Sequence, residues 1–347
     1  MKIIIANSQV PFITGGAENL SYGLEHALKE HGHNVEIVRL PFKWYPPERI
    51  PEHILASRLL DLTESSGDKI DLLVGLKFPA YYIKHPNKVL WILHQHRPAY
   101  DLWGTPYQDI PNTIEGINIR NTIINADNNF LKEAKKIFTI SKTVTDRLKR
   151  YNNIVSEVLY HPPKNHEKLH SEDYDNYILY PSRISILKRQ QLVIQAMGYT
   201  KSNLKLLMAG RPDSEYVLRL VTDEINKNHV EDKVKLLGEV SEDEKIKLYA
   251  NSRAVVFTPF HEDYGYITLE AFYSKKPVIT SADSGGPLEF VDNDVNGFVV
   301  EPNPKMIADA IDKCSDSLNA QRMGNNAYEK IVSMNISWDN VVKALTK

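Results

Sequence analysis

Cysteine is almost missing from this chain, since Cys314 is the only one among 347 residues. A single thiol excludes an internal disulfide and a metal cluster held by cysteines. Long apolar runs are also lacking, because none approaches the roughly 20 residues of a membrane span. The apolar run that follows Met1 is too short for the core of a signal peptide. These absences lead us to expect a cytoplasmic protein.

The chain carries no large excess of charge of either sign. It has 42 Lys and Arg residues against 44 Asp and Glu residues, which gives a formal net charge of −2. This balance argues against binding of nucleic acid by the protein as a whole.

One region is nevertheless locally basic. A solvated helix explains such a cluster more often than a lipid-binding face does. We therefore expect at most weak peripheral contact with anionic lipid, at the inner membrane face. The basic residues concerned are Lys132, Lys135, Lys136, Lys142, Arg147, Lys149 and Arg150.

The length of the chain suits two α/β domains better than one core. Short apolar runs alternate with helical spacing, which predicts parallel sheets covered by helices on both faces. The pattern restarts after the polar stretch 166–176, which we interpret as a linker. We predict two doubly wound, Rossmann-like domains, residues 1–168 and 169–335, that face a cleft. The expected strands are 3–6, 35–38, 72–74, 89–93 and 137–140, then 177–180, 204–208, 234–237, 254–257 and 277–280.

A dinucleotide-binding fingerprint is also absent, because no Gly-x-Gly-x-x-Gly follows the first expected strand. The loop there contains Thr14, Gly15 and Gly16 instead. Glycines let the backbone approach a ligand closely. An ordinary turn is the alternative interpretation.

The strongest chemical signal lies between Glu262 and Glu270, two carboxylates that flank a glycine turn and an expected helix start. The free N–H groups and the positive end of that helix suit a diphosphate. A carboxylate one turn into the helix can accept hydrogen bonds from a pair of sugar hydroxyls. Taken alone, acidic residues near helix starts are more often caps.

Two further patterns follow apolar runs. Arg183 and Lys188, five positions apart, could clamp a diphosphate, the first as a fork and the second as a mobile point charge. A solvated basic loop is the commoner alternative. His94 and His96 follow the run 89–93, but a histidine pair without a third ligand is weak evidence for a metal. The polar segment 292–294 is typical of a surface turn.

From Glu262 to Glu289 the chain resembles the retaining glycosyltransferases of sequence family 4, which have GT-B architecture. The hallmark of that family is a Glu, seven residues, a second Glu, a small residue, Lys-Pro-Val-Ile, Gly-Gly and a third Glu. Here these are Glu262, Glu270, Ala271, residues 276–279, Gly285, Gly286 and Glu289.

The resemblance implies a role for each matching position. Glu270 is expected to bind the ribose of the nucleotide, and Glu262 to face the transferred sugar as a catalytic residue. Backbone amides of Tyr266 and Ile267 are expected near the diphosphate. Relatives often carry Gly-Phe-Gly where this chain has Asp263, Tyr264 and Gly265, so we expect these three to contact the donor sugar in a different way.

Other positions match outside this segment. Relatives have Gly-Arg followed by a Lys five positions after the Arg; Arg183 and Lys188 match, whereas Ser182 replaces the glycine. Gly15 and Gly16 match a glycine pair near the diphosphate. His96, followed by Pro98, matches the active-site histidine, which is expected to hydrogen-bond the donor sugar or the developing charge. Arg97 stands where relatives often have an acidic residue.

The implied activity is transfer of a hexose from a nucleotide-diphosphate sugar to a saccharide, lipid-linked or small-molecule acceptor with retention of configuration. Neither a metal nor another cofactor is expected. The first domain is expected to bind the acceptor and the second the nucleotide sugar, with a helix at about 336–347 that packs back onto the first. Two alternatives remain: a GT-B nucleotide-sugar epimerase, and a non-catalytic nucleotide-sugar-binding protein.

Overall fold

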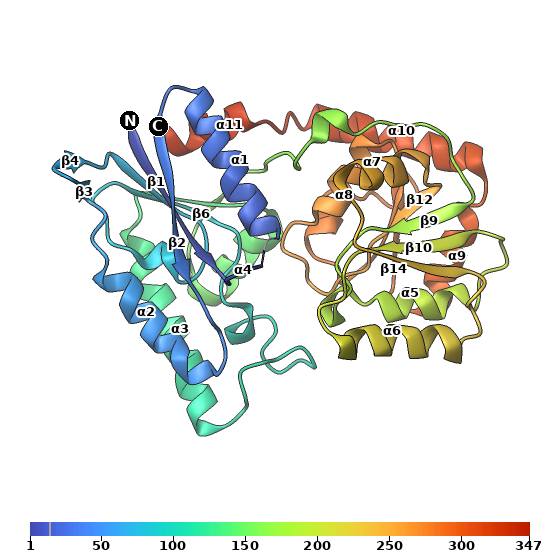
Figure 1. Cartoon of the computed structure of the whole chain (residues 1–347), viewed down its shortest axis with the longest axis horizontal. Helices are drawn as coiled ribbons and strands as arrows, with labels where there is room; N and C mark the ends of the chain where they lie inside the picture. The colour runs from blue at the N-terminus through green and yellow to red at the C-terminus, as the bar shows by residue number, and fades with distance from the viewer. Residues whose placement is uncertain (14) are drawn as a thin grey trace. The chain divides into compact units, whose positions relative to one another are not determined.

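The computed structural model of the chain describes residues 1–13 and 15–347. It forms two compact units (Figure 1): unit 1 contains Met1–Lys164 and Ile336–Lys347, and unit 2 contains Asn165–Asn335. Each unit is a parallel sheet with helices on both faces, so the predicted α/β fold is confirmed.

Thr14, part of the predicted glycine loop, lies outside the described residues. None of the helices within the described ranges combines the length and the apolar character needed to span a bilayer.

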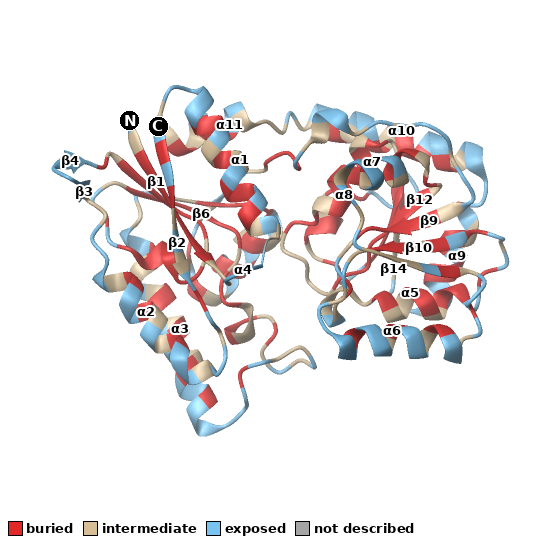
Figure 2. Cartoon of the chain, in the orientation of Figure 1, coloured by how far each residue is buried: buried red, intermediate tan, exposed pale blue. Residues whose placement is uncertain are grey.

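Unit 1 contains a parallel sheet in the order β2-β1-β5-β6-β7-β8. Every residue of β5 and β6 is buried (Figure 2), as expected for parallel strands covered on both faces. The order changes direction between β1 and β5. The strands are β1 (Lys2–Gln9), β2 (Asn34–Pro41), β5 (Leu72–Gly75), β6 (Lys88–Ile92), β7 (Lys136–Thr139) and β8 (Glu157–Val158), and β3 (Glu64–Ser65) pairs with β4 (Asp68–Lys69) in a separate hairpin.

The helix after Ile336 packs onto α1 in unit 1. A Cβ added to Gly23 of α1 would lie 2.4 Å from the Trp338 ring. That ring also contacts Trp91 and His161, with centroids 6.2 and 5.8 Å apart. The helices of unit 1 are α1 (Gly16–Glu30), α2 (Ile50–Leu59), α3 (Ile114–Phe130), α4 (Lys142–Asn152) and α11 (Trp338–Thr346), with 3-10 turns η1 (Pro47–Arg49), η2 (Ala80–Tyr82), η3 (Arg97–Ala99) and η4 (Leu131–Glu133).

Unit 2 contains a parallel sheet in the order β11-β10-β9-β12-β13-β14. This is the Rossmann order, which changes direction between β9 and β12, and ligands bind beyond the carboxyl ends of the strands at that point. The strands are β9 (Tyr177–Tyr180), β10 (Lys205–Ala209), β11 (Val234–Gly238), β12 (Ala254–Val256), β13 (Val278–Ser281) and β14 (Gly297–Val300).

Helices α5, α6 and α9 cover one face of this sheet, and α7, α8 and α10 cover the other (Figure 1). A capping box begins α7, because Ser241 Oγ accepts a hydrogen bond from Glu244 N and the Glu244 carboxylate accepts one from Ser241 N. The helices are α5 (Gln190–Met197), α6 (Glu215–Lys227), α7 (Glu242–Asn251), α8 (Tyr266–Tyr273), α9 (Pro304–Lys313) and α10 (Ser317–Ser333), with 3-10 turns η5 (His166–Lys168), η6 (Ile186–Lys188) and η7 (Gly286–Glu289).

Two features of unit 2 differ from the prediction. Strand β14 was not expected, because it is short and begins at a glycine next to a polar turn. The stretch 166–176 is not a free linker: Glu172 N donates to Ala250 O (2.8 Å), and Tyr174 OH donates to Lys275 O (2.6 Å). These bonds attach the polar segment to unit 2 as a surface strap.

Lys276 contacts this strap from inside the unit. Its side chain is 0% exposed, its Nζ donates to Asp173 O (2.7 Å), and the Nζ lies 3.5 Å from the Tyr174 ring centroid. Burial lowers the pKa of Lys276 to about 7, although Asp173 and Asp175 oppose the change.

Each unit has its own spectroscopic or chemical reporter. All four tryptophans lie in unit 1. The single cysteine, Cys314, lies in unit 2, and burial raises its pKa to about 12. Because the thiolate is the reactive form, pulse labelling of Cys314 after equilibration in urea follows the unfolding of unit 2.

The low pKa of Lys276 predicts a pH dependence of stability. Its folded pKa, about 7, lies below its ordinary value of 10.5. Between these values the unfolded chain binds the extra proton, so the free energy of unfolding from this group rises with pH, by up to about 1.4 kcal/mol per pH unit. The stability of the wild type relative to Lys276→Met should therefore increase from pH 7 to pH 9. Lys227→Met, on the exposed surface of α6, should show no such change. An equal difference at both pH values would contradict the prediction.

Candidate active site

Two predicted site residues meet where unit 2 changes strand direction. Lys188 lies in the loop after β9, and Glu262 in the loop after β12. Their Nζ and Oε2 atoms are 2.6 Å apart, although 74 positions separate them in the chain. Both side chains are half-buried. A cation and a carboxylate thus occupy the place where this topology binds ligands.

Arg189 fixes the loops that carry this pair. Its guanidinium donates hydrogen bonds of 2.6–2.8 Å to the carbonyls of Thr258 and Pro259, to Ser281 Oγ and to both oxygens of Asp283. Burial alone would raise the pKa of Asp283, but the guanidinium lowers it below its ordinary value. One side chain therefore joins the loops after β9, β12 and β13.

Gly285 and Gly286, the glycine pair of the family hallmark, pack against the backbone of Glu262. Glu262 N donates to Ser284 O (2.8 Å), and Gly286 N donates to Glu262 O (2.7 Å). Gly285 has a φ of 74°, and a Cβ there would lie 2.5 Å from Glu262 O. This close approach requires a glycine.

Glu270 lies on α8 and is held by two side chains of α7. Lys245 Nζ lies 3.1 Å from Glu270 Oε1, and the Tyr249 hydroxyl donates to Oε2 (2.7 Å). Sequence reasoning missed both partners. Their spacing of one helical turn was visible, but nothing in it indicated that this face of α7 meets α8.

The start of α8 follows the predicted glycine turn. Gly265 has a φ of 87°, and a Cβ there would lie 2.9 Å from Pro287. Tyr266 and Ile267 are the first two residues of the helix, where backbone N–H groups have no partner within the helix. Burial, and then the charge of Glu270, raise the pKa of Tyr266.

Asp263 is half-buried, whereas Tyr264 is only 2% exposed. The Tyr264 ring packs edge-on against Tyr266 and Phe290, at 5.2 and 5.8 Å between centroids. The side chain is thus part of the core, and a contact between this residue and a sugar falls to its backbone.

Arg183 lies on the same loop as Lys188 but has another partner. Its side chain is 62% exposed, and its guanidinium lies 2.8 Å from the Asp213 carboxylate. Among the described residues, Lys188 is hydrogen-bonded to Glu262, whereas Arg183 is hydrogen-bonded to Asp213 and not to Glu262.

His96 follows β6 in unit 1 and is buried beside Phe78 and Phe42, at 5.1 and 6.1 Å between ring centroids. Burial, with a smaller effect of His94, lowers its pKa to about 3, so the ring is neutral at neutral pH. Within residues 1–13 and 15–347, His96 Nε2 and both side-chain atoms of Asn7 have no hydrogen-bond partner. Buried polar atoms of this kind usually bind a ligand or water.

Asp127 anchors the segment that contains His96, and sequence reasoning missed it. Burial raises its pKa despite the hydrogen bonds that it accepts. The only sequence signal was a carboxylate on the inner face of a helix. The donors are Tyr81 (3.0 Å), Tyr82 (2.7 Å), Tyr100 (2.5 Å) and Gln95 (3.0 Å).

Gly15 and Gly16 lie at the start of α1. Gly15 N donates to the buried carboxylate of Glu18 (2.7 Å). A diphosphate at this position would lie next to the Glu18 carboxylate in the first turn of α1. The hydrogen bond from Gly15 N to Glu18 would have to break before Gly15 N could donate to the diphosphate.

The basic segment in unit 1 is not one solvated face. Arg147 is buried, and its guanidinium lies 3.2 Å from Asp101, which also pairs with Arg97 at 2.8 Å. Lys142 pairs with Asp146 at 2.9 Å. The positive charge of this segment is therefore partly neutralised within the unit.

The described ranges contain no cluster of three or more His, Cys, Asp or Glu side chains suited to a metal ion. Segment 292–294 is an exposed turn, as predicted: Asp294 N donates to Gly297 O (2.9 Å), and Asp292 pairs with Lys330.

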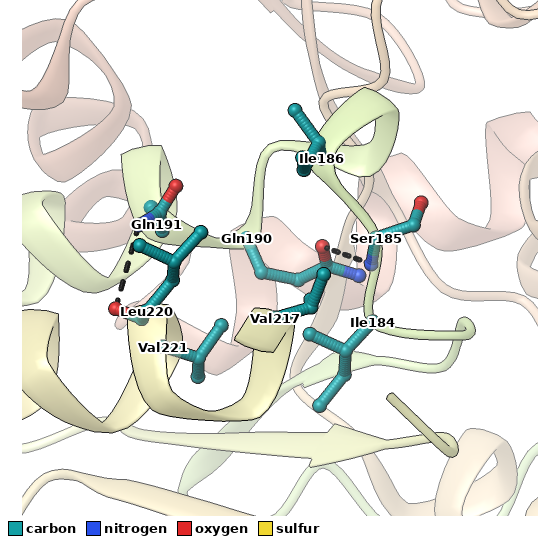
Figure 3. A pocket seen from close by; sticks show the side chains of 8 residues that line it. All are labelled: Ile184, Ser185, Ile186, Gln190, Gln191, Val217, Leu220 and Val221. Carbon is teal, nitrogen blue, oxygen red and sulfur yellow. Dashed lines mark hydrogen bonds between the residues drawn. The ribbon is translucent and has the colours of Figure 1, made fainter. Parts of the chain in front are cut away.

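A small pocket lies beside the Lys188 loop, between residues 184–186 and helices α5 and α6 (Figure 3). Gln190 accepts a hydrogen bond from Ser185 N (3.3 Å), and Gln191 donates to Leu220 O (3.4 Å). Its volume of about 10 Å³ has room for one water at most. It is a gap under the loop and too small for a nucleotide.

Comparison with known proteins assigns the class. Residues 162–330 match the family described as Glycosyl transferases group 1. The chain is 26% identical to the uncharacterized glycosyltransferase MJ1607 of Methanocaldococcus jannaschii, over 99% of this chain and 96% of that protein. An 80-residue stretch is 42% identical to human alpha-1,3/1,6-mannosyltransferase ALG2, covering 23% of this chain and 19% of that protein.

Two solved structures share the fold. Sucrose-phosphate synthase from Thermosynechococcus elongatus has a TM-score of 0.79 at 15% identity, covering 100% of this chain and 98% of that one. Anabaena HepE in complex with UDP-glucose has a TM-score of 0.73 at 16% identity, with the same coverage. The two parallel-sheet units thus make this chain a GT-B protein. The comparisons support the predicted glycosyltransferase: residues 162–330 match the group 1 glycosyl transferase family, and the relative that spans the chain is named a glycosyltransferase.

The contacts of Arg189 predict a large loss of stability on its removal. Arg189→Ala loses five hydrogen bonds and leaves Asp283 without its partner, so the free energy of unfolding of unit 2 should fall by about 3 kcal/mol. Urea unfolding with pulse labelling of Cys314 measures this. Arg219→Ala, an exposed arginine on α6, should change stability by less than about 0.5 kcal/mol.

A second variant separates bonding from backbone strain. Arg189 has a φ of 55°, in the left-handed region. Arg189→Gly loses the same bonds but relieves the strain, so it should be more stable than Arg189→Ala by about 1 kcal/mol. Equal stability of Arg189→Ala and wild type would show that the guanidinium does not hold these loops.

Proposed function

We propose that this glycosyltransferase transfers a hexose from a nucleotide-diphosphate sugar to a saccharide, lipid-linked or small-molecule acceptor with retention of configuration. The observation that supports this most strongly is the Lys188–Glu262 pair, 2.6 Å apart at the carboxyl ends of β9 and β12. Helix α8, with Glu270 inside it, follows directly.

In this proposal, unit 2 binds the donor. Lys188, Arg183 and the N–H groups of Tyr266 and Ile267 bind the diphosphate, and Glu270 binds the ribose. Without a donor, Lys188 is neutralised by Glu262. A diphosphate offers Lys188 more negative charge than one carboxylate does. The exchange of partner frees Glu262 to accept hydrogen bonds from the donor sugar, beside Asp263, Gly265 and the Tyr264 backbone.

Transfer breaks the bond between the anomeric carbon and the diphosphate, which leaves with the electron pair. The acceptor oxygen forms the new bond on the same face of the sugar and loses its proton. Fixed cations next to the leaving group stabilise the charge that develops on it. We assign this role to Lys188 and Arg183.

Unit 1 binds the acceptor and contributes His96. Since the ring is neutral at neutral pH, it acts through a hydrogen bond and not as a cation. Its Nε2, which has no hydrogen-bond partner among the described residues, is the atom available for this bond. Gly15 and Gly16 approach the donor diphosphate through their backbone.

The comparisons suggest which donors to test first. Human ALG2 and Salmonella RfbU are named as mannosyltransferases, and the HepE structure contains UDP-glucose. Mannose and glucose are therefore the first sugars to examine, each carried on UDP and on GDP.

Binding of a donor is expected to raise the thermal stability of the protein. One nucleoside diphosphate and its sugar should bind in calorimetry, and Glu270→Ala and Arg183→Ala should each weaken binding roughly tenfold or more. Glu301→Gln, at an exposed position, serves as the control. Lack of binding by every nucleotide of the panel would overturn the proposal.

Turnover distinguishes a transferase from its alternatives. Glu262→Gln should lower kcat on the order of a hundredfold or more, because it removes a charge next to the reacting sugar. NMR of the product should show the anomeric configuration of the donor. An epimerised nucleotide sugar formed without acceptor would indicate an epimerase instead, and binding without turnover a non-catalytic protein.

A further inference from the structure

Helix α7 presents Lys245 and Tyr249 to the same carboxylate. The two residues lie one turn apart on one face of the helix. Lys245 Nζ binds Glu270 Oε1 at 3.1 Å, and the Tyr249 hydroxyl binds Oε2 at 2.7 Å. Lys245 also pairs with Glu242 at 3.0 Å. Among residues 1–13 and 15–347, each oxygen of Glu270 thus has one side-chain donor.

The acceptor capacity of Glu270 is half used. An ionised carboxylate has about four lone-pair positions. Lys245 and Tyr249 occupy one on each oxygen. One position on each oxygen is then available to a ligand, which matches the two adjacent hydroxyls of a ribose.

The Glu270 carboxylate is buried beside an opposite charge. Its side chain is only 10% exposed, and an isolated carboxylate at such a site is costly to ionise. Lys245 supplies the opposite charge. Burial alone would lower the pKa of Lys245, but the carboxylates of Glu270 and Glu242 raise it above its ordinary value. The lysine therefore stays charged while it is mostly enclosed.

We propose that Lys245 is a positioning residue of the ribose site. Its ammonium pairs with the buried Glu270 carboxylate, and together with Tyr249 it orients the carboxylate so that the remaining lone pairs receive the 2′- and 3′-hydroxyls. Lys245 thereby sets the preference of the site for ribose over 2′-deoxyribose. This inference rests on the proposed function, in which Glu270 binds the ribose.

The ribose is distant from the bond that breaks, so its contacts stabilise the ground state and the transition state equally. Loss of such a contact raises KM and leaves kcat unchanged. A purely structural role of Lys245 would instead lower stability and affect all nucleotides alike.

The experiment measures calorimetric binding of UDP and GDP and of their 2′-deoxy counterparts. In the wild type, the ribonucleotide that binds should do so roughly ten- to a hundredfold more tightly than its 2′-deoxy form. Lys245→Met should weaken ribonucleotide binding about tenfold and binding of the 2′-deoxy form clearly less, because that form presents only its 3′-hydroxyl to Glu270. Lys245→Arg should restore much of the preference, because the cation is retained.

Three controls complete the test. Lys247→Met changes an exposed lysine of the same helix and should bind like the wild type. Glu270→Ala should lose the preference for ribose completely. Pulse labelling of Cys314 checks that each variant is folded, and Tyr249→Phe probes the second donor if Lys245→Met is not folded.

The outcomes separate this inference from the proposed function. If the wild type binds no nucleotide, the proposed function fails, and this inference fails with it. If Glu270→Ala loses the preference for ribose while folded Lys245→Met keeps it, the donor site stands and the role of Lys245 is wrong. An equal loss of ribo- and deoxyribonucleotide binding in Lys245→Met would also contradict the role.

Discussion

The guanidinium of Arg189 is the contact on which the donor-side geometry depends. Lys188 directly precedes it in the chain, and Glu262 follows the two carbonyls to which it donates. The separation of the cation and the carboxylate is therefore set by one rigid fork. Its left-handed backbone costs about 1–2 kcal/mol. Five hydrogen bonds in a half-buried site offset that cost, and they join the loops after β9, β12 and β13.

A second constraint is electrostatic: in the absence of ligand, charges of the site have protein partners. Lys188 pairs with Glu262, Arg183 with Asp213, and Glu270 with Lys245. A ligand must therefore offer more than a hydroxyl to displace a carboxylate from Lys188. A free sugar lacks this charge, whereas a diphosphate has it. In the function proposed above, this pairing favours a charged donor over an uncharged sugar.

Local patterns predicted the parallel strands other than β8 and β14, and the helix after Gly265, because each depends on residues close in sequence. The short strand β14 and the attachment of segment 166–176 to unit 2 were not predicted. For the segment, polarity alone does not distinguish a linker from a bound surface segment. The resemblance directed attention to Lys188 and Glu262, but their contact required the fold. Arg189, Lys245 and Asp127 were missed because their partners lie on other elements, and only packing brings them together.

The path of the chain has a consequence for synthesis on the ribosome. Unit 2 is complete in sequence at Asn335, whereas unit 1 also needs Ile336–Lys347. Trp338 fills the space against Gly23 and contacts Trp91, so a nascent unit 1 lacks part of its core until that residue emerges. Domains usually fold in the order in which they are made. Here the unit that starts first is finished last, and the space beside Gly23 and Trp91 stays unfilled while unit 2 is translated.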